Sequence, residues 1–551
     1  MNRKYMTAAL ALAAAMGAWA QTDTLTTRSM TIEGTYRASV TEAQKEMPVP
    51  EKPQVTTTQQ QVSYVTEEKP FTGFTRQSMQ PMGQSLGQRY QYIGLARLGY
   101  GMRHNLDGLL DLGIDFSDND HLKLNGNMSG WNTETIEDWR SKMFELNTSA
   151  GYEHNFRKFS VGADAGFSVE RFNYLQTGMV FGDGVPRQFL VGGNAGVNMK
   201  SHNTDVVDFS LSAGWYGLSA ENTGYNPVNG RENLIRVAGH IGYNYGDGRI
   251  VLEYKQKTAF YDWRTRVGSV MYDNYTTLSL TPYLTWQNED IHALAGMDVN
   301  IHTDEGHLFQ FSPKVEASYR LFSNLDLIAK VNGGIQDYDM RYMYAFSPYW
   351  SDSRQIRDGY AILNLQAGAV YSPLEYISLS LTAGERVVRN DLFQIIGLAD
   401  ILDDQTSMDN SIVTSSIVQD KSNLLFAELT GKVAVAEWLK GDFLVGGYKW
   451  GVVDSREALM MRPAFKAEGH VRGNLFGVVN ADLSYRYHIL TEHMGNRFSA
   501  LNDLGASVDY TWRDNLTFTV KGTNLLNRHS FMYAGYPMQN WAITGGVAYR
   551  F

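Results

Sequence analysis

The chain has 551 residues, a formal net charge of -10 and no cysteine. The negative charge argues against a nucleic-acid partner, which a basic surface would hold. The lack of cysteine excludes a disulfide framework and a lipoprotein anchor on an N-terminal cysteine. Past residue 20, no apolar run approaches the roughly 18 residues that a membrane-spanning helix needs.

Residues 1–20 have the order of a secretory signal peptide. Arg3 and Lys4 supply positive charge, residues 6–16 are almost wholly Ala, Leu and Met, and Ala18 and Ala20 suit a cleavage site. The apolar run is too short to span a membrane as a helix, and polar residues follow it. We therefore expect an exported protein from which residues 1–20 are removed.

Residues 21–88 differ in composition from everything that follows. They hold 5 of the 13 prolines and the polar run Val55–Gln61. Few apolar residues are available there to offset the entropy of ordering the chain. We expect an extended or disordered tail in the periplasm or the barrel lumen, with a short strand near Ser29–Val40 as the alternative.

From Arg89 to the C-terminus, apolar and polar residues alternate. The clearest segment has apolar residues at every second position, namely Phe159, Val161, Ala163, Ala165, Phe167 and Val169. A period of two gives a strand one apolar and one polar face. The mean hydropathy of -0.31 is compatible with membrane strands, because alternation hides their apolar face from an average. The 32 Tyr, 25 Phe and 11 Trp suit the two aromatic belts of a membrane barrel.

Short turns alternate with longer polar loops along this region. The short connections are Asp118–Asp120, His154–Lys158, Gly246–Gly248, Ser323–Asn324 and Arg513–Asn515. The longer ones are Trp131–Ser141, Arg171–Val185, Gly217–Gly230, Met340–Asp358 and Arg389–Lys421. Short periplasmic turns and long extracellular loops are typical of outer-membrane barrels.

These patterns predict an all-β fold in which residues 89–551 form one transmembrane, antiparallel, up-and-down β-barrel. Counting segments gives about 22 strands, with His302–Phe309 and Leu398–Val418 ambiguous. A soluble array of β-sandwiches would show linkers between domains, and a propeller would show a blade repeat; neither is found after residue 89. We expect the barrel in the outer membrane of a Gram-negative-type bacterium.

The last strand carries the most specific pattern. One face holds an alternating apolar set that ends in an aromatic residue, namely Trp541, Ile543, Val547, Tyr549 and Phe551. Such an ending resembles the signal by which the barrel assembly machinery recognises outer-membrane proteins. The alternative is an ordinary final strand that ends in phenylalanine.

The segment before this strand resembles the closing hairpin of TonB-dependent receptors. The residues that carry the resemblance are Asn524, Leu525, Leu526, Asn527, Tyr536 and Pro537. The resemblance implies a wide receptor-like barrel. Residues 537–540 depart from the Pro-Gly-Arg that commonly opens the last strand of that family.

A larger departure concerns the plug domain of that family, which is on the order of 130–150 residues and fills the lumen. Residues 21–88 are too few and too polar for such a packed domain. Leu25–Thr27 is not a convincing apolar box for contact with TonB. We therefore expect a barrel without its plug, and energy-coupled import does not carry over.

No catalytic, cofactor or metal site emerges from the sequence. The 12 histidines are scattered and none stands in a nucleophile motif, so we expect no enzyme. Clustered carboxylates can bind calcium, but their spacing here fits no EF-hand loop, and a solvated acidic loop is the better interpretation. The weak metal candidates are Asp400, Asp403, Asp404 and Asp409.

Two functions remain open. The barrel takes part in transport or binding of a solute across the outer membrane, in a porin-like or receptor-like manner. Alternatively, it is a non-transporting, membrane-anchored component that recruits periplasmic or outer-membrane protein partners through its tail and long loops. A barrel this wide must be closed by something in either case. Long loops, above all Arg389–Lys421, the tail or a separate protein would close it.

Overall fold

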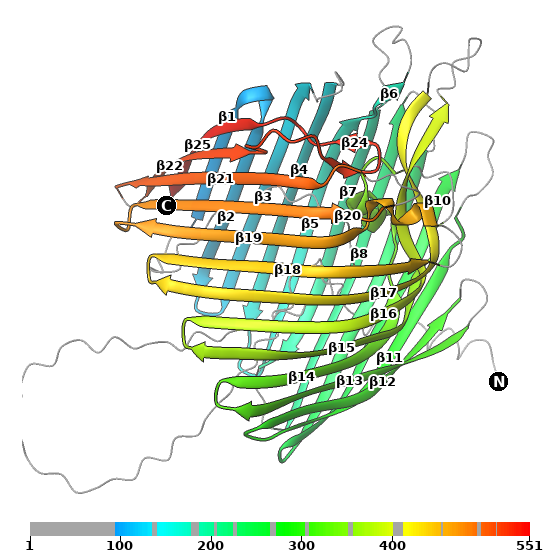
Figure 1. The fold of residues 1–551 in the computed structure, drawn as a ribbon. Coiled ribbons are helices and arrows are strands. Elements are labelled where there is room, and N and C mark those ends of the chain that lie inside the picture. Colours follow the sequence, from blue (N-terminus) through cyan, green and yellow to red (C-terminus); the bar gives the residue numbers. More distant parts are fainter. Residues whose placement is uncertain are drawn as a thin grey trace, which may run out of the picture. The chain divides into compact units, whose positions relative to one another are not determined.

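The computed structural model describes residues 94–551, apart from 135–139, 178–186, 203–205, 224–228, 265–271, 304–307, 351–355, 401–410, 453–455, 493–497 and 514. The predicted signal peptide and tail lie outside the described residues. The described part is almost wholly β-strand (Figure 1). Among the described residues, no helix is long and apolar enough to cross a membrane.

The strands follow one another along the chain as antiparallel neighbours. They are β1 (Gly94–Gly101), β2 (Leu106–Ser117), β3 (Asp120–Glu134), β4 (Arg140–Asn155), β5 (Phe159–Asn173), β6 (Gln176–Thr177), β7 (Arg187–Ser201), β8 (Val207–Thr223), β9 (Asn229–Tyr245), β10 (Gly248–Arg264), β11 (Tyr275–Gln287), β12 (Ile291–His302), β13 (Phe309–Phe322), β14 (Leu325–Gln336), β15 (Gly359–Leu374), β16 (Ile377–Asp400), β17 (Ser411–Ala436), β18 (Leu439–Val452), β19 (Pro463–Leu475), β20 (Val479–Leu490), β21 (Leu501–Trp512), β22 (Leu516–Thr523), β23 (Phe531–Tyr533), β24 (Tyr536–Pro537) and β25 (Ala542–Arg550). Short helices lie in the connections, namely η1 (Met102–His104), α2 (Met340–Phe346) and η2 (Arg456–Met461).

The first and last strands close the sheet into a barrel. β1 pairs with β25 from Leu95↔Arg550 to Gly101↔Thr544. Gly94 and Phe551 exchange two backbone hydrogen bonds, of 2.9 and 3.0 Å. The wall has 22 strands, while β6 pairs only with β17 and β23 pairs only with β24. The predicted fold class and strand number are confirmed.

The outer face of the wall is apolar. Along β25, Ile543, Val547 and Tyr549 are exposed, whereas Ala542 and Ala548 on the other face are buried. Exposed Leu, Ile, Val, Phe, Tyr and Trp recur at alternate positions of the other wall strands in the same way. An apolar outer band on a closed barrel is the surface that meets lipid in outer-membrane proteins. The chain is therefore an outer-membrane β-barrel.

The predicted short turns all lie at one end of the barrel, and the longer connections lie at the other. Several predicted loops are shorter than expected, because strands occupy part of their ranges; β3 runs to Glu134 and β8 to Thr223. The prediction of a polar loop at Arg389–Lys421 is wrong for its described residues. They form the ends of β16 and β17, which pair from Asp391↔Asp420 to Asp400↔Ser411. The ambiguous segment His302–Phe309 is the connection between β12 and β13.

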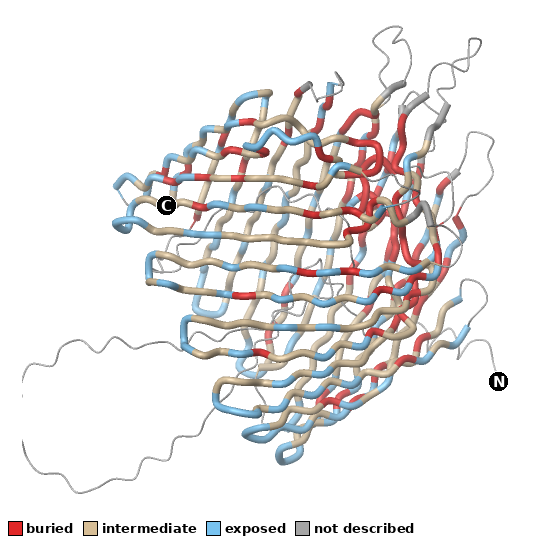
Figure 2. Tube along the Cα trace, viewed as in Figure 1, coloured by how far each residue is buried: buried red, intermediate tan, exposed pale blue. Residues whose placement is uncertain are grey.

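Buried residues gather at the end of the barrel that carries the long connections (Figure 2). The opposite end, with the short turns, is largely exposed. A barrel wall alone buries little, since each strand has lipid on one side and the lumen on the other. The buried cluster therefore marks where connections pack inside the mouth.

Candidate functional site

The connection between β14 and β15 folds into the barrel mouth. We call its described residues, 337–350 and 356–358, the cap. Asp339 starts the helix α2, because its side chain accepts a hydrogen bond from the Tyr342 amide at 2.8 Å. Met340, Met343, Tyr344 and Phe346 on this helix are buried. The interpretation of Met340–Asp358 as a polar loop is therefore wrong for its described residues, which include a helix and many buried apolar side chains.

The cap is the centre of the largest buried cluster in the described part of the chain. Wall strands from opposite sides of the ring contribute to it, with β5, β7 and β8 on one side and β16 and β17 on the other. Its buried members are Phe172, Tyr174, Leu190, Leu218, Ala220, Trp263, Tyr272, Tyr338, Met340, Met343, Tyr344, Phe346, Tyr349, Trp350, Ile356, Leu392, Val413, Ile417, Tyr533 and Tyr536. The cluster therefore spans the mouth from wall to wall.

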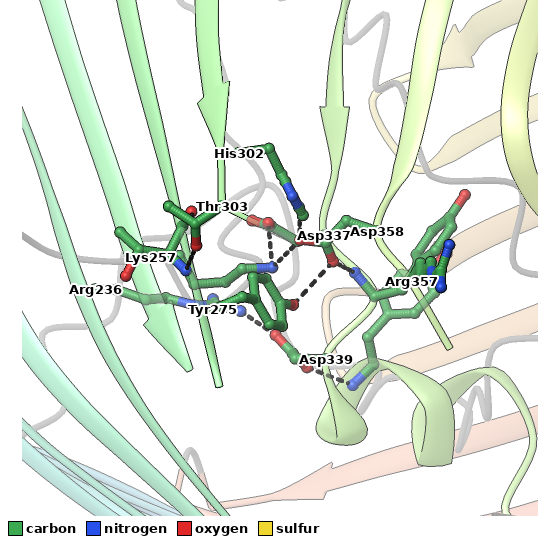
Figure 3. Close-up of polar contacts among 12 residues, drawn as sticks. Arg236, Lys257, Tyr275, His302, Thr303, Asp337, Asp339, Arg357 and Asp358 are labelled. Carbon is green, nitrogen blue, oxygen red and sulfur yellow. Dashed lines mark hydrogen bonds and ion pairs between the residues drawn. The ribbon is translucent and has the colours of Figure 1, made fainter. Parts of the chain in front are cut away.

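A buried lysine holds both ends of the cap. The ammonium of Lys257, on β10, lies 2.7 Å from Asp337 and 2.6 Å from Asp358 (Figure 3). The side chains of Lys257 and Asp358 are 4% and 1% exposed, so solvent screens their attraction little. We call these three residues the latch. It joins the two ends of the cap to each other and to the wall.

Further polar groups complete the environment of Asp358. Its carboxylate accepts hydrogen bonds from the Tyr275 hydroxyl at 3.2 Å and from the Tyr338 amide at 2.8 Å. His302 lies 3.5 Å away on β12. Burial would raise the pKa of Asp358, but Lys257 and these hydrogen bonds outweigh it and hold that pKa well below its usual value.

A second ionic contact lies one strand away. Arg236, on β9, pairs with Asp339, and its guanidinium lies over the ring of Tyr216 at 5.4 Å. The buried Glu232, also on β9, accepts a hydrogen bond from the Met340 amide at 2.8 Å. Both contacts tie the first turn of α2 to the wall.

On the other side of the mouth, two glutamines bind the cap to the ends of β16 and β17. Gln394 donates to the Phe346 carbonyl at 2.9 Å. It also accepts from the Ser415 hydroxyl at 3.3 Å and from the Ala534 amide at 3.2 Å. Gln419 accepts from the Arg357 amide at 2.9 Å and donates to the Arg357 carbonyl at 2.6 Å.

Main-chain contacts reinforce the same side. The Ser415 amide donates to the Tyr349 carbonyl at 2.8 Å, and Trp350 forms an isolated bridge with Ser415. β6 pairs antiparallel with Ser411 and Ile412 of β17, whereas the Trp350 bridge is parallel. The first residues of β17 therefore have two added partners beyond the point where β18 has ended.

The closing hairpin named from the sequence is a structured loop that contributes to this cluster. Asn524 is buried, has φ 45° and donates to the Gln539 carbonyl at 2.8 Å. Asn527 accepts from the Trp541 amide at 3.1 Å. The Tyr536 hydroxyl donates to the Val413 carbonyl. Pro537 lies in β24, while Leu525 and Leu526 are exposed.

Of the assembly residues predicted at the C-terminus, Ile543, Val547 and Tyr549 lie on one face of β25, and Phe551 follows directly after it. Trp541 precedes the strand, and the guanidinium of Arg103 lies over its ring at 5.7 Å. Ile543, Val547, Tyr549 and Phe551 all point outward and are exposed. The rings of Tyr549 and Phe551 stack with centroids 5.8 Å apart. Their role in assembly stays a prediction.

The predicted weak metal candidates lie beyond what can be described. Asp403, Asp404 and Asp409 lie outside the described residues, and of Asp400 only the backbone is described, at the end of β16. Among the described residues, no group of three or more carboxylate, histidine or cysteine side chains is placed to hold a metal ion.

One constellation that the sequence did not reveal resembles a hydrolase triad. Ser210 lies 2.6 Å from Nδ1 of His240, whose Nε2 lies 2.9 Å from Asp208. Similar histidine–carboxylate pairs recur around the wall, at His154–Asp120, His470–Asp482 and His488–Glu468. The backbone amides of β8 and β9 serve the sheet ladder, so no oxyanion donors converge there. These pairs are wall contacts between neighbouring strands.

Comparisons with known proteins show which solved structures have a similar fold. No family model and no curated protein matches the sequence. Among solved structures, the copper transporter OprC is similar with a TM-score of 0.61 at 13% identity, covering 83% of this chain and 80% of that one. The ferric-catecholate import receptor Fiu from E. coli K12 is similar with a TM-score of 0.59 at 10% identity, covering 84% and 82%.

The ferripyoverdine receptor of the outer membrane of Pseudomonas aeruginosa, bound to ferripyoverdine, gives a TM-score of 0.61 at 12% identity, covering 84% of this chain and 72% of that one. At such identities the likeness concerns the fold. It confirms the resemblance that the closing hairpin predicted: this chain has the barrel fold of TonB-dependent receptors.

Proposed function

We propose that the chain takes part in transport or binding of a solute across the outer membrane, and that the cap is the gate of its outer mouth. The long connections of such barrels face the cell exterior, which puts the cap on the outside. The similar structures include a copper transporter and receptors for ferric compounds. These similarities support transport or binding of a solute, but they do not identify the solute.

The observation that carries the proposal is the latch. Lys257 holds Asp337 and Asp358 at once, and these residues begin and end the cap. A connection that only stiffened the rim would need no buried ion pair in the mouth. Removing one partner of a buried pair destabilises by about 3–5 kcal/mol, because the other charge is left uncompensated. Lys257 thus contributes a large share of the energy that holds the two ends of the cap to the wall.

Single-channel recording in planar bilayers tests the gate. We expect little conductance from the full chain, and an open fraction at least about tenfold higher in Lys257→Met, since 1.4 kcal/mol already corresponds to tenfold. Lys255→Met is the matched control, because Lys255 lies two residues away on the same strand and makes no contact with the cap. The same variants are recorded with residues 21–88 deleted, so that obstruction by that segment does not hide the gate.

Two outcomes would contradict the proposal. Large steady conductance from the intact chain would show a permanently open pore. If no variant conducts, with or without residues 21–88, the result would favour the non-transporting role in an assembly with partner proteins.

A further inference from the structure

The ends of β16 and β17 stand above their neighbours as a separate hairpin. β15 pairs with β16 only up to Tyr360↔Arg389, and β17 pairs with β18 only from Ser422↔Val452 downward. Beyond these points, residues 391–400 and 411–420 pair with each other and with no other strand of the wall. We call these residues the upper hairpin.

A bulge separates the upper hairpin from the wall. The register of β16 and β17 shifts between Val388 and Asp391, and Asn390 adopts a positive φ of 55°. A bulge bends its strand and interrupts the ladder. Arg462 supports the bend from outside the hairpin, since it pairs with Asp391 at 3.6 Å and lies over the ring of Phe393 at 4.7 Å. This geometry supplies a pivot at Asn390.

The upper hairpin contacts both halves of the cap above this pivot. Gln394 holds the end of α2 through the Phe346 carbonyl, and Gln419 holds both backbone groups of Arg357, next to the latch residue Asp358. Between them, the Ser415 amide bonds the Tyr349 carbonyl. Buried Leu392, Val413 and Ile417 pack into the same cluster as the cap.

The two sides of the cap are therefore held differently. Toward β9 and β10 the polar contacts are mainly ionic, made by Arg236 and Lys257 to side chains of the cap, and Trp263 of β10 packs in the same apolar cluster. Toward the upper hairpin the polar contacts go to the backbone of the cap, from the side chains of Gln394 and Gln419 and from the Ser415 amide. Leu392, Val413 and Ile417 add apolar packing on that side. Ionic contacts to a fixed wall can part while the packed side stays together. A displacement of the hairpin would then be transmitted to Asp358 of the latch through the bonds of Gln419 to the backbone of Arg357.

We propose that the cap and the upper hairpin move as one body about Asn390, so that the hairpin is the handle by which a solute or protein outside the membrane opens the gate. The biological role of this coupling rests on the proposed gating function, but the coupled motion itself can be measured independently of conductance. It also identifies Gln394 and Gln419 as positioning residues that transmit motion between the hairpin and the cap.

Distance measurement between two spin labels tests this coupling. The chain has no cysteine, so Ile396→Cys on the upper hairpin and Phe260→Cys on β10 are the only attachment sites. Both side chains are exposed, at 48% and 44%. Phe260 lies on the outer face of β10, and Ile396 lies on the hairpin face that carries Leu392 and Gln394, two residues beyond their contacts with the cap. The labelled full chain is measured in lipid nanodiscs, with and without Lys257→Met.

We expect Lys257→Met to shift the mean distance measurably, as a hinge motion of the hairpin would, although Lys257 contacts no residue of the hairpin. Adding Gln394→Ala and Gln419→Ala should reduce this shift, because the cap then loses the glutamine bonds and keeps the Ser415 amide bond and the apolar packing to the hairpin. Lys255→Met and Gln366→Ala are the matched controls and should leave the distance unchanged.

The outcomes separate the coupling from the gate. An unchanged distance in Lys257→Met together with raised conductance would overturn the coupling and leave the gate standing. A shifted distance without raised conductance would support the coupling and overturn the gate. A shift that the double glutamine substitution leaves undiminished would show that Gln394 and Gln419 do not transmit the motion, against the role that the proposal gives them.

Discussion

The ring of Tyr536 stacks on the ring of Tyr349, with centroids 3.4 Å apart and planes 5° from parallel. Tyr349 belongs to the cap, whereas Tyr536 lies in the connection before the last strand. The same Tyr536 hydroxyl bonds the Val413 carbonyl of the upper hairpin. One side chain thus joins three connections that are far apart in the sequence. The mouth is closed by contacts among connections as much as by contacts with the wall.

This stacking leads to a prediction for Tyr536. Tyr536→Ala should loosen the cap, since truncating a buried aromatic costs about 3–5 kcal/mol. Tyr536→Phe keeps the ring and should cost only about 1 kcal/mol through its hydroxyl bonds. Limited proteolysis of the purified barrel reports the difference as cleavage within the cap. Heat-modifiability should stay normal in both variants, because the wall does not depend on this ring; equal cleavage of the two variants would contradict the role of the ring.

The low pKa of Asp358 makes the latch insensitive to moderate acid. A carboxyl whose pKa is depressed in the folded protein stabilises it at every pH above its unfolded value of about 3.9, and this stabilisation is lost as the pH falls through the folded pKa. The conductance of the full chain should therefore stay low from about pH 8 to about pH 5. Asp358→Asn should conduct more throughout this range. A wild-type gate that opened between pH 7 and 5 would show that other groups control it.

The wall could be predicted from the sequence because lipid imposes a simple rule on it. Every outward position must be apolar, and the period of two therefore appears in each strand. The rule ends where the strands leave the membrane. The sequence of residues 391–400 and 411–420 lacks the clear alternation of the wall strands, so they were interpreted as a loop. The pairing that extends them is between the two strands themselves.

The cap could not be predicted by periodicity, but its composition carried a signal. Residues 338–350 hold six aromatic side chains, at Tyr338, Tyr342, Tyr344, Phe346, Tyr349 and Trp350. So many aromatic groups are costly to leave in water, which argues for burial. The position of each strand around the barrel decides which strands these aromatic residues contact, and it also brings Lys257 to Asp358. The spacing of residues in the sequence does not encode these contacts across the barrel.

Topology can be tested on intact cells. A peptide tag inserted after Gln405, between β16 and β17, should be reached by antibody without permeabilisation, because the long connections face outward. A tag in the turn at Asp247 should be reached only after the outer membrane is opened. The opposite pattern of labelling would put the cap on the periplasmic side.

The last prediction concerns assembly. Tyr549 and Phe551 are 45% and 48% exposed on the lipid-facing side, so their side chains add little to packing within the finished barrel. Phe551 is held in the closed ring by its backbone bonds with Gly94, which substitution of its side chain leaves intact. If replacing these two aromatic side chains has a large effect, that effect must therefore arise before the barrel closes.

We accordingly expect Tyr549→Ala with Phe551→Ala to lower the amount of protein in the outer membrane severalfold, with precursor degraded in the periplasm. The matched control replaces Tyr510 and Phe518 by alanine, since these exposed aromatic residues are cross-strand partners on β21 and β22 and carry no terminal signal. Quantitative immunoblots of membrane fractions measure the amounts, and heat-modifiability reports the folding of whatever is inserted. Equal losses in both double variants would show that the terminal rings serve only the lipid-facing band. A selective loss in the terminal pair, with normal heat-modifiability of the remainder, is the result that a recognition signal requires.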